Sequence, residues 1–160
     1  MKFEKVSFEV FEESVGHEEQ MYNDIKLPRR ATENSAGYDF FLPCDIILYP
    51  NEVCLIPTGI KCQLDADKVL NIYPRSGLGF KYKIRLCNTV GIIDADYYNN
   101  EKNEGHIMIK ISNEGVNTVK LNKGDAFAQG VIQQYFLTED DALTEKQVRA
   151  GGFGSTSKGE

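Results

Sequence analysis

Residues 106–112, with the sequence HIMIKIS, indicate the fold class of this chain. Ile107, Ile109 and Ile111 occupy alternate positions there. Side chains of a β-strand point alternately to its two faces, so this two-residue period predicts a strand with one buried face.

The same period recurs toward the N-terminus. It is present in two further runs: Val6, Phe8 and Val10, and Ile60, Cys62 and Leu64. The first run predicts that the chain opens as a strand. Turn residues separate the runs, as in residues 57–59 and 122–125. Short strands at such spacing favour an all-β sandwich, barrel or jelly roll. Helical periodicity is weak, and only two short helices are predicted, one after Ser76 as N-cap and one over residues 138–148.

The length and composition indicate one globular domain, which we place at residues 1–148. The chain has 160 residues, 41% hydrophobic and 26% charged. Residues 12–24 contain five acidic side chains and predict an exposed loop or arm. Residues 149–160 are rich in Gly and predict a flexible C-terminal arm.

Charge and cysteine usage exclude several classes of protein. A net charge of −6 argues against a protein whose main task is to bind nucleic acid. No apolar run is long enough to cross a membrane. The four cysteines form no C-x-x-C pair, which favours reduced thiols and a cytoplasmic location. His17 and His106 are far apart in the sequence and predict neither a catalytic triad nor a zinc site, so both are expected at the surface.

Three segments carry residues suited to chemistry. Residues 73–80, YPRSGLGF, offer a guanidinium, a hydroxyl and a Gly, which suit phosphate oxygens but also suit a turn that begins a helix. Residues 91–98 place Asp94 and Asp96 two positions apart, where they can bind a cation, orient water or bond loop amides. In residues 124–129, Gln129 is either a structural amide or a ligand contact.

Taken together, these segments resemble the five motifs of the trimeric dUTPase family. The motifs are residues 36–40 (AGYDF), 74–77 (PRSG), 88–97, 124–129 and 149–156, in the family's order. The resemblance covers the chain from about Leu27 to the C-terminus. It implies a jelly-roll-like β fold and a homotrimer with active sites at the subunit interfaces. It also implies Mg²⁺-assisted attack of water on the α-phosphorus of dUTP, which yields dUMP and pyrophosphate and limits uracil in DNA.

The resemblance assigns Asp94 as the general base that holds the attacking water. Contacts to the triphosphate are implied for Arg75, Ser76, Gly77 and Gln129. Mg²⁺ is expected to be held mainly by the substrate phosphates, with Asp39 as a water-mediated contact.

Recognition of the nucleoside is implied for the third motif. Asn88 and the backbone of Gly91, Ile92 and Ile93 would form a hairpin that reads the edge of uracil. Tyr97 would pack against the deoxyribose and exclude a 2′-hydroxyl. Met108 would touch substrate through its backbone.

The fifth motif implies an arm that closes over the site from a neighbouring subunit. Phe153 would cover the uracil, and the remaining contacts are implied for Arg149, Gly154, Ser155 and Thr156.

The chain departs from the family pattern at three places. Ala126 stands where the family usually has Arg in motif four. The spacing from Arg149 to Phe153 is one residue short, so Lys146 is an alternative cation. Residues 99–104 form an insertion that we expect to project into solvent.

Two other functions remain open from the sequence. A dCTP deaminase of the same fold relies on a catalytic Glu that we do not find near the third motif. A regulatory protein on this scaffold would use nucleotide binding to switch a partner-protein contact, for which the acidic segment 12–24 and the insertion are candidate surfaces.

Overall fold

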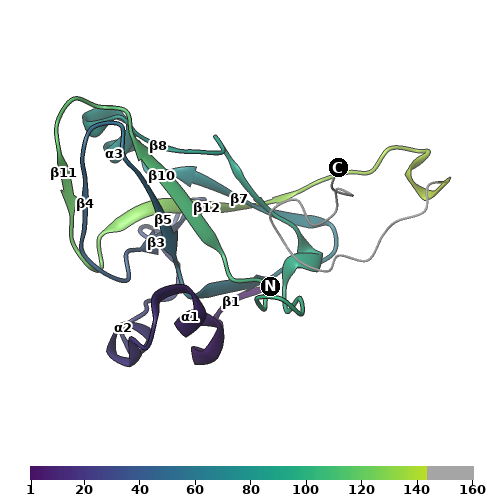
Figure 1. Cartoon of the computed structure of the whole chain (residues 1–160). Coiled ribbons are helices and arrows are strands. Elements are labelled where there is room, and N and C mark those ends of the chain that lie inside the picture. Colours follow the sequence, from purple (N-terminus) through teal and green to yellow (C-terminus); the bar gives the residue numbers. More distant parts are fainter. Residues whose placement is uncertain (144–160) are drawn as a thin grey trace, which may run out of the picture.

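The computed structural model describes residues 1–143, and its strands pair in a nested order (Figure 1). Strand β3 (Tyr38–Phe41) pairs with β12 (Ala126–Gln134). Strand β4 (Ile46–Leu48) pairs with β11 (Val119–Leu121), and β5 (Val53–Pro57) pairs with β10 (Met108–Asn113). Early strands thus meet late strands in reverse order, as in a jelly roll folded from one long hairpin. The predicted all-β, jelly-roll-like fold is confirmed.

The remaining strands extend these pairs into sheets. Strand β1 (Lys2–Lys5) pairs with β6 (Ile60–Gln63), and β8 (Ile84–Leu86) joins β10. The largest sheet has the order β2-β3-β12-β7-β9, in which β2 is Arg29–Arg30, β7 is Lys68–Pro74 and β9 is Gly91–Ile93. The strands predicted around Ile60 and Ile109 are therefore present.

Alternating burial along the strands builds the core. Ile107, Ile109 and Ile111 are all buried, and the rings of Phe40 and Phe127 lie fully inside. Burial of such side chains is the main favourable term for a fold of this size.

The predicted opening strand is wrong beyond Lys5. Residues Phe8–Val15 form helix α1, because the Ser7 hydroxyl accepts a hydrogen bond from the Val10 amide and caps the first turn. Phe8, Phe11 and Val15 also share the three- to four-residue period of a helix face, and Phe11 is fully buried. The overlapping two-residue period concealed this signal.

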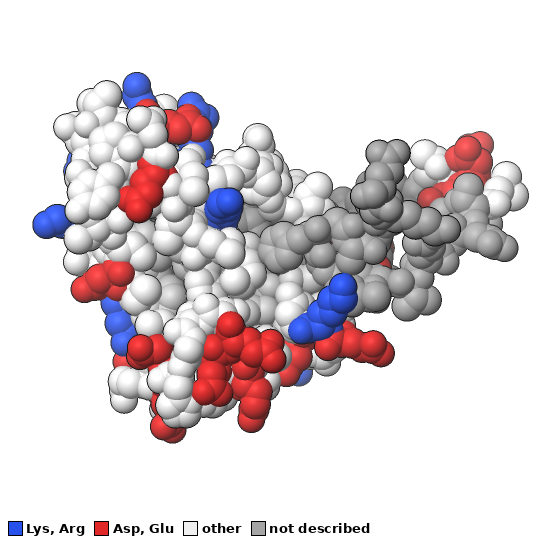
Figure 2. All heavy atoms as spheres, in the orientation of Figure 1, with Lys and Arg blue, Asp and Glu red and all other residues white. Residues whose placement is uncertain are grey.

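The acidic segment 12–24 is not a simple loop. It includes the end of α1 and helix α2 (Glu19–Asn23), which packs back through the contact of Tyr22 with Phe11. The acidic side chains of Glu13, Glu18 and Glu19 remain exposed, and Figure 2 shows acidic residues gathered on this side of the molecule. The segment is therefore an exposed acidic surface on an ordered helical layer.

The other helices are short. Helix α3 (Ser76–Tyr82) confirms the helix predicted after Ser76, although Arg75 holds the N-cap position and Ser76 is the first helical residue. Two single 3₁₀ turns, η1 (Ala95–Tyr97) and η2 (Asp141–Leu143), follow. Of the helix predicted over residues 138–148, only η2 falls within the described part. Among the described residues no helix is long and apolar enough to cross a membrane, and the four cysteines are free.

Candidate functional site

One group of predicted site residues meets where β7 ends, and we call it the Arg75 end. Gln129 on β12 lies between Asp39 on β3 and Tyr73 on β7. Arg75 follows β7, and its Nε lies 3.4 Å from Oδ1 of Asp39. The Gln129 side chain donates to the carbonyl oxygen of Pro74 over 3.3 Å. Motifs one, two and four are therefore joined by neighbouring strands of one sheet.

Gly37 lies directly against the Gln129 amide in this packing. A Cβ atom at Gly37 would lie 2.6 Å from Oε1 of Gln129, well inside van der Waals contact. The glycine of motif one thus makes room for the amide of motif four.

Ser76 and Gly77 are exposed in the first turn of α3. A Cβ added to Gly77 would meet no atom within 4 Å, so packing within the described subunit does not explain a glycine here. Open space beside a backbone amide and a guanidinium is suited to the close approach of a phosphate.

Asp94 lies at the other end of β7, which we call the Asp94 end. Strand β9 pairs with β7 so that Ile93 is opposite Leu70. Asp94 follows β9 and is half-buried. Arg75 is five residues beyond Leu70, a separation of roughly 16 Å at the rise of an extended strand. A single subunit therefore keeps Asp94 apart from the Arg75 end.

The predicted hairpin around Asn88 takes a different form. Strand β8 belongs to the sheet with β10, and β9 belongs to the sheet with β7, so the turn between them crosses between sheets. Thr89 has a φ of 65° in this turn, and the Asn88 side chain is exposed. A Cβ on Gly91 would lie 3.1 Å from Cβ of Ile72, so the β9 backbone lies close against β7. Ile92 points outward and is exposed.

Tyr97 is buried, with 6% of its surface exposed. Its hydroxyl donates to the carbonyl oxygen of His106 over 2.9 Å and accepts from Nδ2 of Asn103 over 2.8 Å. The expectation that residues 99–104 project into solvent holds only for Asn99, Glu101 and Lys102, which are exposed. Asn100 is buried and Asn103 half-buried, because their amides satisfy the polar groups around Tyr97.

His106 is also not a surface residue, contrary to the expectation from the sequence. Only 1% of it is exposed, and Nε2 accepts a hydrogen bond of 2.8 Å from the Gly59 amide. Burial lowers the pKa of His106 to about 4, which keeps the ring neutral. The described contacts give His106 a structural role beside Tyr97. His17, in contrast, is exposed as expected.

The remaining predicted residues are distributed as follows. Met108 is half-buried on β10, opposite Pro57, in a different sheet from Asp94 and Arg75. The residues assigned to the fifth motif lie outside the described part of the chain: Lys146, Arg149, Phe153, Gly154, Ser155 and Thr156.

Two cations beside the Arg75 end were missed from the sequence. Phe41 lies opposite Ala126, the position where the family usually has Arg. Nζ of Lys26 lies 5.9 Å and Cζ of Arg29 5.5 Å from the centre of the Phe41 ring. The adjacent basic pair at residues 29–30, just before motif one, was the available signal.

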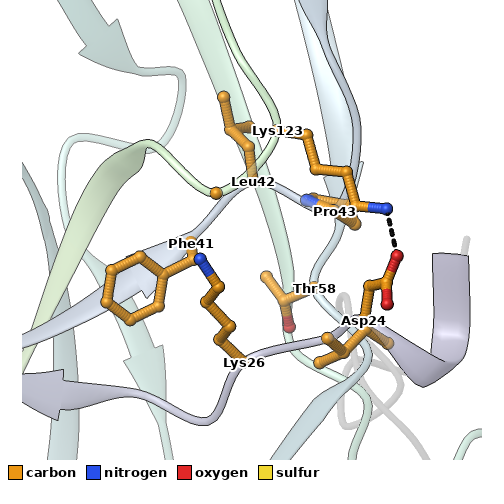
Figure 3. Close-up of a pocket in the computed structure, with 9 residues that line it drawn as sticks. Asp24, Lys26, Phe41, Leu42, Pro43, Thr58 and Lys123 are labelled. Atoms are coloured by element: carbon orange, nitrogen blue, oxygen red, sulfur yellow. Dashed lines mark hydrogen bonds and ion pairs between the residues drawn. The ribbon is translucent and has the colours of Figure 1, made fainter.

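A pocket of about 340 Å³ opens next to Lys26. Figure 3 shows Lys26 beside Phe41, and Lys123 paired with Asp24 across the pocket at 2.6 Å. Because Phe41 is two residues from Asp39 on β3, this basic pocket adjoins the Arg75 end. The pocket therefore places positive charge next to the region expected to receive a triphosphate.

Comparisons with known proteins identify the family of the chain. A family model described as dUTPase matches residues 23–157. The chain is 43% identical over 132 residues to a deoxyuridine 5′-triphosphate nucleotidohydrolase of Lactococcus lactis, covering 82% of this chain and 88% of the relative. It is 39% identical over 138 residues to the protein of that name from a Thermoanaerobacter species, covering 83% and 89%.

Solved structures give the same result. The fold matches the crystal structure of a dUTPase from Streptococcus mutans with a TM-score of 0.69 and 32% identity, covering 87% of this chain and 99% of that one. The dUTPase of a Staphylococcus aureus phage, phi11, matches in fold with a TM-score of 0.65 at 22% identity, covering 92% and 94%. On the family match and on these relatives, the chain belongs to the dUTPase family.

Proposed function

We propose that this chain hydrolyses dUTP to dUMP and pyrophosphate as a Mg²⁺-dependent enzyme of the cytoplasm. The observation that carries this proposal is the grouping of Asp39, Arg75 and Gln129 at one end of β7, with Asp94 at the other end. The resemblance assigns Arg75 and Gln129 to the phosphates, Asp39 to a water-mediated contact with Mg²⁺, and Asp94 to the attacking water.

The active enzyme is a homotrimer in this proposal. Within a subunit, Arg75 lies roughly 16 Å along β7 from Leu70, the residue opposite Ile93, so Asp94 and Arg75 are too far apart to contact one phosphate group. Threefold assembly would bring the Asp94 end of one copy to the Arg75 end of the next. Exposed Ile92, Phe136 and Leu137 support such contacts, and after β12 the chain runs away from the body of the molecule (Figure 1).

At the joined ends, the Asp94 carboxylate holds a water molecule and takes its proton as the oxygen attacks the α-phosphorus. A bond forms from the water oxygen to this phosphorus, and the bond from the α-phosphorus to the oxygen that bridges to the β-phosphate breaks. Arg75, Ser76, Gly77 and Gln129 bind phosphate oxygens. Such donors act by stabilising charge that develops on those oxygens.

The described residues fit a metal that is carried by the substrate. They contain no group of three or more His, Cys, Asp or Glu side chains that could hold an ion. Mg²⁺ commonly uses one or two carboxylates together with substrate phosphates, and Asp39 is the carboxylate placed among the phosphate-binding residues. When bound, Mg²⁺ would neutralise charge on the triphosphate and the leaving pyrophosphate.

The nucleoside is read from the Asp94 end. In the proposal Asn88 and the backbone of Gly91, Ile92 and Ile93 bond the uracil edge, and Met108 contributes a backbone contact. The buried ring of Tyr97 is a fixed wall, which suits the exclusion of a ribose 2′-hydroxyl.

The fifth motif completes the site from a neighbouring subunit. Phe153 covers the base, and Arg149 or Lys146 together with Gly154, Ser155 and Thr156 closes over the phosphates.

Pyrophosphate release from dUTP with Mg²⁺ tests this function. We expect rapid release from dUTP, weak release from UTP and dCTP, and loss of turnover when EDTA removes the metal. Ammonia release from dCTP in place of pyrophosphate release from dUTP would instead identify a deaminase.

A further inference from the structure

The hydroxyl of Tyr97 is held by two different parts of the chain. It donates to the His106 carbonyl oxygen and accepts from the Asn103 amide, at 2.9 and 2.8 Å. A buried tyrosine needs such partners, and together they fix the direction of the ring. Of these two partners, only Asn103 acts through its side chain, and it belongs to the insertion at residues 99–104.

Asn103 is itself held in place by the insertion. Its Oδ1 accepts from the Gly105 amide at 3.1 Å and from Nδ2 of Asn100 at 2.8 Å. Nδ2 of Asn100 also donates to the Tyr97 carbonyl oxygen at 2.8 Å. The amide of Asn103 therefore has a defined orientation, with its NH₂ group directed at the Tyr97 hydroxyl.

The insertion lies close against the Tyr97 backbone. Gly105 has a φ of 82°, and a Cβ there would lie 2.6 Å from the Tyr97 carbonyl oxygen. Only glycine meets both conditions without strain. The backbone at the end of the insertion thus packs directly against Tyr97.

The insertion is anchored to the N-terminal helical layer. Oε2 of Glu104 accepts from the Ser7 amide at 3.1 Å and from Nζ of Lys61 at 2.9 Å. Ser7 is the N-cap of α1, and Lys61 also donates to Asn99 Oδ1 at 2.8 Å. A second tie is the hydrogen bond from the Tyr98 hydroxyl to Glu4.

These contacts join the insertion to the N-terminal segment. The family model matches residues 23–157, so residues 1–22 precede its match, and the resemblance implies that residues 99–104 replace a tighter turn. We propose that Asn103 is a positioning residue for sugar selection, which holds Tyr97 in the orientation that excludes a 2′-hydroxyl, and that Glu104 braces it against the N-terminal layer. This inference rests on the proposed function of Tyr97.

A double-mutant cycle on sugar selectivity tests the proposal. The measured quantity is the ratio of kcat/KM for dUTP to kcat/KM for UTP, in Tyr97→Phe, Asn103→Ala and the double variant. Each single change should lower the ratio about fivefold, the usual effect of losing one hydrogen bond. The double variant should be about as selective as Tyr97→Phe alone, because that change already removes the contact with Asn103 together with the bond to the His106 carbonyl oxygen.

Two further variants calibrate the result. Glu101→Ala changes an exposed side chain of the same insertion and should leave the ratio unchanged. Glu104→Gln keeps the shape of the anchor but weakens its charge-assisted bonds, and should lower the ratio roughly twofold. Thermal unfolding and light scattering identify a variant that fails to fold, and in that case Tyr97→Phe and Glu104→Gln carry the test.

The outcomes separate this inference from the function of Tyr97. If Tyr97→Ala relaxes the ratio but Asn103→Ala and Glu104→Gln do not, Asn103 has no positioning role. Additive losses in the cycle would overturn the inference as well. If Tyr97→Ala itself leaves the ratio unchanged while dUTP is still hydrolysed, sugar selection lies elsewhere and the role proposed for Tyr97 is wrong.

Discussion

The two ends of β7 are built from different kinds of interaction. The Arg75 end is polar and half-exposed, and its contacts are the ion pair of Arg75 with Asp39 and the amide of Gln129. Near the Asp94 end, Tyr97 and His106 are buried and their polar groups are bonded within the subunit. The Arg75 end is suited to binding a charged group, and the Asp94 end is suited to recognising the shape of a ligand.

This difference indicates that the two ends have different roles in the proposed site. An anion is best met by mobile, partly solvated cations and open amides, whereas discrimination of a sugar or base requires rigid buried groups. Because one sheet holds both ends apart, the proposed function requires the two ends to come from different subunits.

The largest effect is expected from a change at the Asp94 end. Asp94→Asn keeps the size of the side chain but removes the base, so kcat should fall by about 10²-fold or more. Binding of a non-hydrolysable dUTP analogue should persist, because the phosphate contacts lie at the other end. Steady-state kinetics and calorimetric titration measure the two quantities, and near-normal turnover would move the base to another residue.

The buried support of the Asp94 end should make stability depend on pH. His106 has a pKa of about 4 in the fold against an ordinary value of 6.5, so the unfolded state binds its proton first. The contribution of His106 to the free energy of unfolding is therefore fully present above pH 6.5 and is lost as pH falls toward 4. This contribution is about 3 kcal/mol.

Urea unfolding of the parent, His106→Gln and His17→Gln between pH 7 and 4.5 measures this contribution. Carboxylates with lowered pKa, such as Glu4 and Asp24, also lose stability in acid, so the difference between variants is the informative quantity. The slope of the free energy of unfolding against pH should flatten in His106→Gln alone. An equal slope in all three proteins would show that His106 does not control it.

A smaller effect is expected at the Arg75 end. Gly37→Ala places a Cβ against Oε1 of Gln129, the tip of a flexible side chain, so the fold should tolerate it while the amide moves. We expect kcat/KM for dUTP to fall roughly tenfold, the effect of losing one well-placed contact to a charged group. In a Gln129→Ala background the same change should have little further effect, and an undiminished loss there would mean that Gly37 acts through another group.

The β-sheet core was predictable because each strand carries its signal within a few residues. The period of Ile107, Ile109 and Ile111 is read directly, and burial of all three follows. The N-terminal helical layer was not predictable in this way, because residues 6–10 fit a strand and a helix equally. The capping hydroxyl of Ser7 decided between them. Short runs with overlapping periods are decided by tertiary contacts.

For the candidate site, the sequence suggested candidate residues but not how they are arranged. The burial of His106 and the packing of Glu104 depend on contacts with Gly59, Ser7 and Lys61, which are distant in the chain. Arg29 lies over Phe41, which is opposite Ala126, only because β2 and β12 flank β3. Such long-range pairings are invisible to local patterns.

The central claim is that Asp94 and Arg75 act on one substrate from different subunits, and complementation tests it directly. Asp94→Asn and Arg75→Ala, each inactive alone, are tagged differently, mixed, unfolded and refolded together. Random assembly should leave about a quarter of the sites with both native residues, and activity should return to about that fraction of the parent. If mixed trimers are recovered through both tags and remain inactive, the two residues do not share a site across subunits.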